Sequence, residues 1–306
     1  KTPTACHTGV LRMLDGRTGE EIWSLRKESA GSSGFAGLST ALADVDGDGR
    51  VDIVAMSGEG FLVAVDASGK VIGKANVAVT GNGNDAFGWG GGIAIADMDG
   101  DGAPEIAYGA AVYTMLGMKA SGVIKQLWVG DAGLGGTGQT TALTYFVDVD
   151  GAADGKLELV AGRTVYKADG SHLWSRTDIS DGFTAIGDFD KNGKPELVLI
   201  DNGKLYVLDA AKGTTLIGPF TLPGSGTGGP PTVADFDGDG KPEINVAQAN
   251  FYAAIKVVLG PTPAASVLWK TANHDLSSSV TGSSVFDFEG DGRAEVIYND
   301  ECFLWV

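Results

Sequence analysis

Short apolar runs of four to seven residues alternate with turns rich in Gly, Asn, Asp and Ser along the whole chain. Runs of this length between turn residues are typical of β-strands, and few segments show helical periodicity. The pattern therefore predicts an all-β protein. Its clearest unit contains four runs, at 184–187, 196–200, 204–208 and 215–220, and Asn202-Gly203 marks a hairpin turn between the second and third runs.

The fourth run of several units carries a recurring aromatic residue. A Leu or Ile precedes a tryptophan at the same place in each of these units, at Trp23, Trp128, Trp174 and Trp269. A bulky side chain at a fixed place in a repeated unit is expected to pack between neighbouring units. We therefore predict that these tryptophans are packing residues and not ligand contacts.

An acidic loop with the pattern D-x-D-x-D-G-x-x-[D/E] follows the first run of each unit. The six copies, which we call loops one to six, begin at Asp44, Asp97, Asp148, Asp188, Asp235 and Asp287. Their starts are 40 to 53 residues apart, and loop three carries two extra residues. A period near this length with several strands per unit is typical of a β-propeller. The pattern predicts four-stranded blades, six by loop count, with seven as the alternative.

Three acids at alternating positions, a glycine and a fourth acid supply the oxygen ligands that Ca²⁺ prefers. The predicted side-chain ligands are Asp44, Asp46, Asp48 and Asp52; Asp97, Asp99, Asp101 and Glu105; Asp148, Asp150, Asp154 and Glu158; Asp188, Asp190, Asn192 and Glu196; Asp235, Asp237, Asp239 and Glu243; and Asp287, Glu289, Asp291 and Glu295. The backbone carbonyls of Arg50, Ala103, Lys156, Lys194, Lys241 and Arg293 are predicted as further ligands. We expect four to six calcium ions.

The position of the last acid distinguishes these loops from an EF-hand. It falls at loop position nine instead of twelve, and strand-like runs flank each loop. The chain has 39 Asp plus Glu against 22 Lys plus Arg, which gives a net charge of −17. Acids crowded in each loop repel one another unless a cation offsets their charge. Calcium is therefore predicted to contribute to folding stability.

The repeated acidic loop between short strands resembles the FG-GAP/VCBS repeat family. Members of this family are the calcium-binding β-propellers of integrin α-subunits and of many bacterial surface and secreted proteins. The resemblance covers nearly the whole chain. It implies a single β-propeller domain over residues 1–306 with structural calcium ions. Calcium loops of this type suit a location outside the cell or on its surface, and the absence of an Asn-x-Ser/Thr sequon suits a bacterial source.

Both ends of the chain carry strand-like runs that belong to one predicted blade. The segment 10–23 is interpreted as the outer strands of that blade and 303–306 as an inner strand, so the termini close the ring. This closure brings Cys6 and Cys302 into the same blade, where they are predicted to form a disulfide. The alternative is two unpaired thiols.

Composition limits the classes of partner. No run of 18 apolar residues is present, so no membrane insertion is expected. The acidity argues against nucleic acid and anionic membranes. The glycine-rich segment 133–138 precedes a strand-like run and not a helix, which argues against a dinucleotide site. We expect a monomeric module.

The segment 80–92 is the richest candidate for ligand contacts. Asn84, Asp85, Phe87 and Trp89 combine polar groups with two aromatic rings, which suits a sugar or a peptide; plugging of the propeller channel is the alternative. The leading functional interpretation is a secreted or surface adhesion module that binds a protein or a glycan. A polysaccharide lyase and an architectural domain of a larger surface protein are the alternatives. Because Lys and Arg are few and no catalytic base stands out, we expect that the chain is not an enzyme.

Overall fold

The computed structural model describes residues 9–26, 34–35, 40–58, 60–77, 91–136, 142–152 and 154–306. The chain divides into two compact units. Unit one consists of Lys1–Val147, Ala153–Ala161 and Val165–His172, and unit two consists of Asp148–Ala152, Gly162–Thr164 and Leu173–Val306. Within the described part of the chain, no helix is long and apolar enough to cross a membrane.

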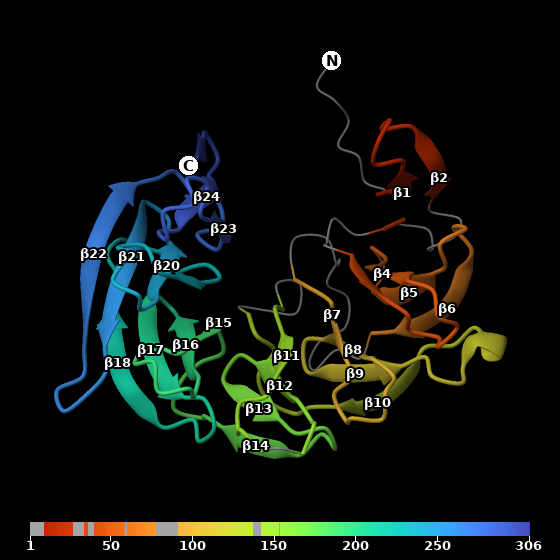
Figure 1. The fold of residues 1–306 in the computed structure, drawn as a ribbon, viewed down its shortest axis with the longest axis horizontal. Coiled ribbons are helices and arrows are strands. Elements are labelled where there is room, and N and C mark those ends of the chain that lie inside the picture. Colours follow the sequence, from red (N-terminus) through yellow and green to blue (C-terminus); the bar gives the residue numbers. More distant parts are fainter. Residues whose placement is uncertain are drawn as a thin grey trace. The chain divides into compact units, whose positions relative to one another are not determined.

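Unit one contains antiparallel sheets that follow one another in chain order (Figure 1). A hairpin of β1 (Leu11–Leu14) and β2 (Glu21–Leu25) comes first. The next sheet has the order β3 (Ala41–Ala43), β4 (Asp52–Met56), β5 (Phe61–Val65) and β6 (Val71–Asn76). It is followed by β7 (Ala94–Ala96), β8 (Glu105–Tyr108), β9 (Ala111–Thr114) and β10 (Lys125–Val129), with the short helix η1 (Lys119–Ser121) before β10.

A third four-stranded sheet has the order β11 (Tyr145–Val147), β12 (Glu158–Ala161), β13 (Thr164–Tyr166) and β14 (His172–Ser175), and the division between the two units falls within it. Unit two continues with β15 (Phe183–Gly187), β16 (Glu196–Asp201), β17 (Lys204–Asp209) and β18 (Thr215–Thr221). The sheet of β19 (Thr232–Ala234), β20 (Glu243–Ala247), β21 (Phe251–Val258) and β22 (Ala264–Ala272) follows. The last sheet contains β23 (Ser283–Phe286), β24 (Glu295–Asn299) and β25 (Leu304–Trp305).

The second strand of each four-stranded sheet is buried along its whole length. Every residue of β4, β16 and β20 is buried, because these apolar strands have a neighbouring strand on both sides and packed side chains on both faces. In unit two, side chains of β16 and β17 share one apolar cluster with those of β20 and β21. In unit one, β4, β5 and β6 share a cluster with β8 and β9. Consecutive sheets within a unit therefore pack face to face.

The first strands of successive sheets also touch one another: β3 contacts β7 and β7 contacts β11 in unit one, and β15 contacts β19 and β19 contacts β23 in unit two. Sheets of four antiparallel strands in chain order, packed face to face with their first strands adjacent, are the blades of a β-propeller. This confirms the all-β, propeller-type prediction. The number of blades, the closure by both termini and the single domain stay predictions.

Three tryptophans form hydrogen bonds from one sheet to the next. The indole Nε1–H donates to a backbone carbonyl in the turn between the third and fourth strands of the following sheet: Trp23 to Ala67 at 3.0 Å, Trp128 to Ala168 at 2.9 Å and Trp174 to Ala210 at 2.8 Å. A glycine lies under each ring, at Gly69, Gly170 and Gly213. This confirms, for these three residues, the prediction that they pack between units.

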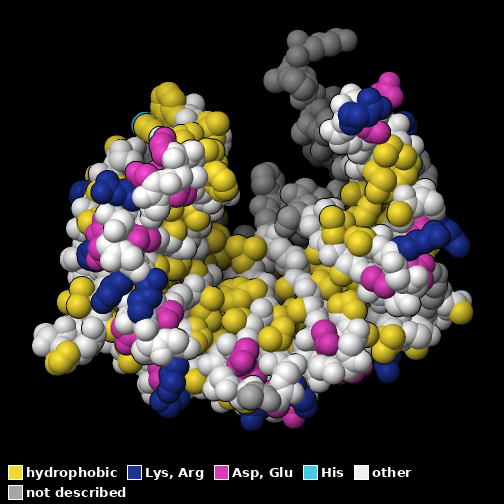
Figure 2. Space-filling model, in the orientation of Figure 1, with side chains coloured by type: hydrophobic (Ala, Val, Ile, Leu, Met, Phe, Trp, Pro, Cys, Tyr) yellow, Lys and Arg dark blue, Asp and Glu magenta, His cyan; other side chains and the backbone are white. Residues whose placement is uncertain are grey.

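Hydrophobic side chains are also exposed at the end of unit two. Figure 2 shows them gathered over β23 to β25. Phe286, Phe288, Phe303 and Leu304 are each more than half exposed. This sheet is therefore less covered than the sheets that precede it in the unit.

Candidate metal centres

The first aspartate of each loop organises the backbone around itself. In loop one, Asp44 Oδ1 accepts hydrogen bonds from the N–H groups of Gly47 at 2.9 Å and Asp48 at 3.0 Å, and its Oδ2 accepts one from Gly49 at 2.8 Å. Both glycines have positive φ, 78° and 82°, a conformation that favours glycine. The loop therefore turns tightly around one carboxylate, which explains the glycines of the repeated pattern.

The same arrangement recurs in other loops. The first aspartate accepts the N–H at the sixth loop position at 2.8 to 2.9 Å in loops two, four, five and six, where the pairs are Asp97 with Gly102, Asp188 with Gly193, Asp235 with Gly240 and Asp287 with Gly292. Loop four departs at its fourth position, where Lys191 takes the place of a glycine and adopts a φ of 63°. A lysine at this position is strained because its Cβ crowds the backbone.

The last acid of each loop is the first residue of the second strand, and in loops one, two, four, five and six it is hydrogen-bonded to the start of the loop. Its carboxylate accepts the N–H of the second loop residue: Asp52 from Val45 at 3.2 Å, Glu105 from Met98 at 2.8 Å, Glu196 from Phe189 at 2.9 Å, Glu243 from Phe236 at 3.0 Å and Glu295 from Phe288 at 2.8 Å. The first four of these acids are buried. Each of these four loops is therefore hydrogen-bonded to a buried carboxylate.

The structure brings together the predicted side-chain ligands of several loops. Oxygen atoms within 4.8 Å of one another come from Asp44, Asp46 and Asp48 in loop one; Asp97, Asp99 and Asp101 in loop two; Asp188, Asp190 and Glu196 in loop four; and Asp235, Asp237 and Asp239 in loop five. These groups contain only carboxylate oxygens, the donors that a hard divalent cation prefers. The residues therefore fit a metal ion of this kind.

Loop three is divided between the two units, and loop six lies in unit two. In loop three, Asp148 and Asp154 each accept one local backbone N–H, from Gly151 at 2.8 Å and Lys156 at 3.0 Å. Loop six is not among the acidic groups that the described residues form. A hydrogen bond to Glu295 raises the pKa of Glu289. The predicted ligand roles of both loops, and of the six backbone carbonyls, stay predictions.

Burial raises the pKa of the last acids. Loss of water around the carboxyl is the main cause, and repulsion by the other loop acids adds to it. The pKa rises to about 6 for Asp52 and to about 7 for Glu105 and Glu196. A bound cation would favour the ionised form of each group, so these loops link metal binding to proton release.

Two predictions fall outside the described residues. The candidate ligand contacts Asn84, Asp85, Phe87 and Trp89 lie there, as does Cys6. Cys302 is exposed in the turn between β24 and β25. The ligand role of the first group and the disulfide therefore stay predictions.

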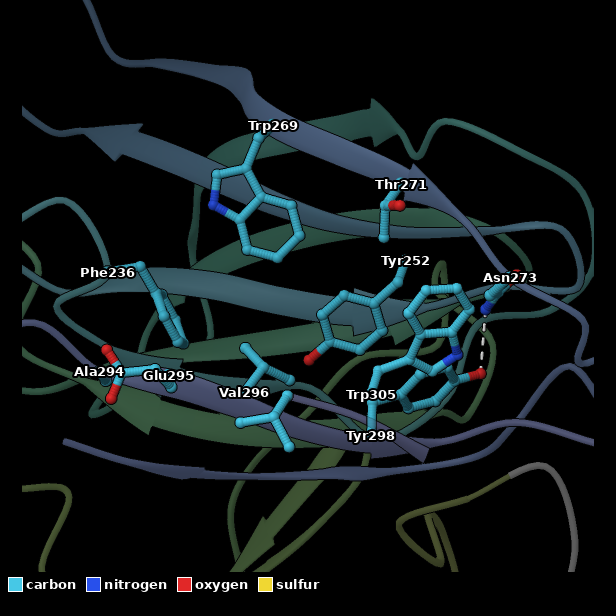
Figure 3. Close-up of a pocket in the computed structure, with 11 residues that line it drawn as sticks. Phe236, Tyr252, Trp269, Thr271, Asn273, Ala294, Glu295, Val296, Tyr298 and Trp305 are labelled. Atoms are coloured by element: carbon cyan, nitrogen blue, oxygen red, sulfur yellow. Dashed lines mark hydrogen bonds between the residues drawn. The ribbon is translucent and has the colours of Figure 1, made fainter. Parts of the chain in front are cut away.

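An aromatic groove in unit two was not foreseen from the sequence. It has a volume of about 370 Å³, and Trp269 and Val296 point into it (Figure 3). The rings of Trp269 and Tyr252 stack with centroids 6.0 Å apart, and the indole of Trp269 is 38% exposed. Asn273 Nδ2 donates to the hydroxyl of Tyr298 at 2.9 Å at one end of the groove. The groove combines residues from β21, β22, β24 and β25, so no local sequence signal indicates it.

Trp269 is the fourth tryptophan of the pattern, and its packing between units stays a prediction. It holds the same place in its strand as Trp23, Trp128 and Trp174, but it faces the groove of Figure 3. The shared Leu/Ile-Trp pattern does not distinguish a covered indole ring from one that faces a groove, because burial of the ring depends on what the next sheet presents to it.

Residues 188–246, which include loops four and five, match the family model described as an FG-GAP-like repeat. The fold thus defines a β-propeller-type protein, in which residues 188–246 resemble an FG-GAP-like repeat. No curated protein sequence matches the chain. Among solved structures, the chain is similar to the V. cholerae biofilm matrix protein Bap1, with a TM-score of 0.61 and 17% identity, over 97% of this chain and 72% of that chain.

Two similar solved structures are rhamnogalacturonan lyases. Rhamnogalacturonan lyase YesW has a TM-score of 0.57 at 18% identity, and the Bacillus licheniformis rhamnogalacturonan lyase PL11 has a TM-score of 0.56 at 17% identity. Each is matched over 95% of this chain, which spans 63% of either lyase chain. The expectation that the chain is not an enzyme is therefore wrong as an exclusion, because the fold it shares with these proteins supports lyases. A low number of basic residues and the lack of an evident catalytic base are not sufficient grounds to exclude enzymatic activity.

Proposed function

We propose that the chain is an extracellular, calcium-stabilised propeller module that binds a polysaccharide. The observation that carries the polysaccharide assignment is the groove of Figure 3, in which exposed aromatic faces lie beside polar side chains. Stacking of a sugar ring on an indole face, with hydroxyl groups bonded to nearby polar atoms, needs such a surface. Trp269 and Trp305, which are 38% and 36% exposed, supply the faces, and Thr271 is one polar neighbour.

The metals are assigned a structural role. Loops one, two, four and five each bring three carboxylates together, and in each a fourth acid or a neutral amide completes the motif. Ca²⁺ takes six to eight oxygens, so an ion that is held by side chains and a backbone carbonyl keeps few positions for a substrate. We assign Ca²⁺ to loops one, two and four, with loops three, five and six as additional candidates.

The extracellular location is supported by the chemistry of the loops and by one comparison. Extracellular calcium modules work at high calcium concentration, where sites on exposed loops are filled. Bap1, which the chain resembles in fold, is a biofilm matrix protein. Adhesion to a matrix polysaccharide is the form of binding that we propose.

Binding is tested on polysaccharides immobilised on a sensor surface in millimolar calcium. We expect retention of the wild-type chain on at least one polysaccharide, and at least tenfold weaker retention of Trp269→Ala and Trp305→Ala. Leu276→Ala is the matched control, because Leu276 is 69% exposed and lies outside the groove. Melting curves of the variants are compared with Trp174→Ala, whose ring is buried between sheets. The groove assignment is wrong if Trp269→Ala melts as early as Trp174→Ala, since the ring would then be covered by protein.

A second candidate is a polysaccharide lyase, which the similarity to YesW and PL11 favours. Elimination leaves a carbon–carbon double bond in the product, which absorbs ultraviolet light. Incubation with rhamnogalacturonan in calcium distinguishes the two candidates. A steady rise in absorbance supports the lyase, whereas binding without that rise supports the binding module.

A further inference from the structure

A lysine from the neighbouring strand lies against loop five. Lys256, in β21, extends its ammonium group over the loop, where Nζ lies 2.7 Å from Asp239 Oδ2 and 3.6 Å from Glu243 Oε1 and also contacts Asp237 Oδ2. The Lys256 side chain is 28% exposed and that of Glu243 is 1% exposed. One ammonium group therefore contacts three of the four acids of the motif.

The register of the sheet places this lysine. Ile244 pairs with Ile255, so Lys256 lies next to the start of β20, where Glu243 stands. Loop four has the opposite charge at the corresponding position, because Asp209 pairs with Glu196. Asp209 adds to the repulsion that raises the pKa of Glu196, whereas Lys256 acts to lower that of Glu243. Loops four and five, which both lie in unit two, thus have different charge balances.

We propose that Lys256 is the built-in counter-ion of loop five, so that this loop is held closed without a divalent cation. The ammonium nitrogen lies among the carboxylates that would otherwise hold Ca²⁺, and each Coulombic contact that it makes lowers the gain from a second cation. Loops one, two and four keep the calcium role. This inference rests on the proposed calcium binding and refines it loop by loop.

The hydrogen bonds of Lys256 are consistent with a stable closure. The Lys256 ammonium group donates hydrogen bonds to the carboxylates of Asp237 and Asp239. Charge-assisted hydrogen bonds of this kind are stronger than neutral ones. Calcium would have to displace the ammonium group before it could occupy loop five.

The experiment counts bound calcium per chain by equilibrium dialysis of metal-free protein. We expect Lys256→Gln to bind one ion more than the wild type, because the vacated carboxylates become available. Lys204→Gln, the same change in β17, is the matched control and is expected to leave the count unchanged. Asp239→Ala is expected to leave the wild-type count unchanged, whereas Asp101→Ala in loop two is expected to lower it by one, because alanine, unlike the Asn192 of loop four, offers no side-chain oxygen at this position.

The outcomes separate this inference from the proposed function. An unchanged count in Lys256→Gln, or a count lowered by one in Asp239→Ala, overturns the lysine closure of loop five. A wild-type count of zero contradicts calcium stabilisation instead, and a gain of one ion in Lys256→Gln would still support the closure. If Lys256→Gln does not refold without metal, the Asp239→Ala result alone decides the question.

Discussion

The indole Nε1–H of Trp174 donates a hydrogen bond of 2.8 Å to the backbone carbonyl of Ala210 in the next sheet. The Trp174 ring lies on Gly213 of the same turn, which has a φ of 68°. A Cβ added to Gly213 would stand 2.6 Å from the ring. The glycine is therefore required both by its backbone conformation and by the aromatic ring above it.

We predict that Gly213→Ala lowers the free energy of unfolding by about 2 to 4 kcal/mol, because left-handed strain and overpacking add. Gly193→Ala is the control, since Gly193 has a φ of 82° but nothing within 4 Å of the added Cβ. Urea unfolding of both variants isolates the contact with Trp174. Equal losses in the two variants would show that the ring tolerates the methyl group.

Loop four offers a stabilising substitution. Lys191 is exposed and has a φ of 63°, at a loop position that other loops fill with glycine. We predict that Lys191→Gly raises the free energy of unfolding by up to about 1 kcal/mol, because strain relief exceeds the added entropy of the unfolded chain. Lys194→Gly, where φ is not positive, should lower stability instead. Thermal melts in calcium measure both, and a loss in Lys191→Gly would contradict the strain.

The raised pKa values predict the pH dependence of the metal-free protein. Asp52, Glu105 and Glu196 have pKa values of about 6 to 7 in the fold, above the ordinary values of 3.8 and 4.5. Between these limits the folded chain binds more protons than the unfolded chain, so its free energy of unfolding falls as the pH rises. We expect melting in chelator to occur at a higher temperature at pH 5 than at pH 8.

Calcium should reverse this slope. The ion binds the ionised carboxylates, so protons compete with it as the pH falls below about 6 to 7. We expect the calcium-dependent rise in melting temperature to be larger at pH 8 than at pH 5. The same pH profile in calcium and in chelator would contradict the link between these carboxyls and metal.

The last acid of a loop should change its effect with metal. Glu196→Gln keeps an oxygen that can accept the N–H of Phe189 but removes one buried charge. In chelator at pH 8 we expect the variant to melt at a higher temperature than the wild type, because the repulsion is relieved. In calcium we expect the reverse, because one ionic ligand is lost. A variant that is less stable in both conditions would indicate a packing role alone.

Local sequence was sufficient to predict where the strands and the acidic loops lie along the chain. The four runs from 184 to 220 coincide with β15 to β18 within two residues at each end, because alternation and the Asn202-Gly203 turn act between near neighbours. The acidic loops were located for the same reason, since Asp44 and its equivalents bond to backbone groups three to five residues ahead. The sequence left a polysaccharide lyase only as an alternative to a binding module, because a fold by itself does not fix an activity.

The sequence by itself determined an all-β repeat and the order of acids within each acidic loop. Only the tertiary structure decided which cation reaches those acids, because Lys256 is 19 residues from Asp237 along the chain and meets it through the register of β20 and β21. It also decided that Trp269 faces a groove while Trp174 is covered. Strand and turn formation depends on residues a few positions apart, whereas these contacts depend on how whole sheets align and pack.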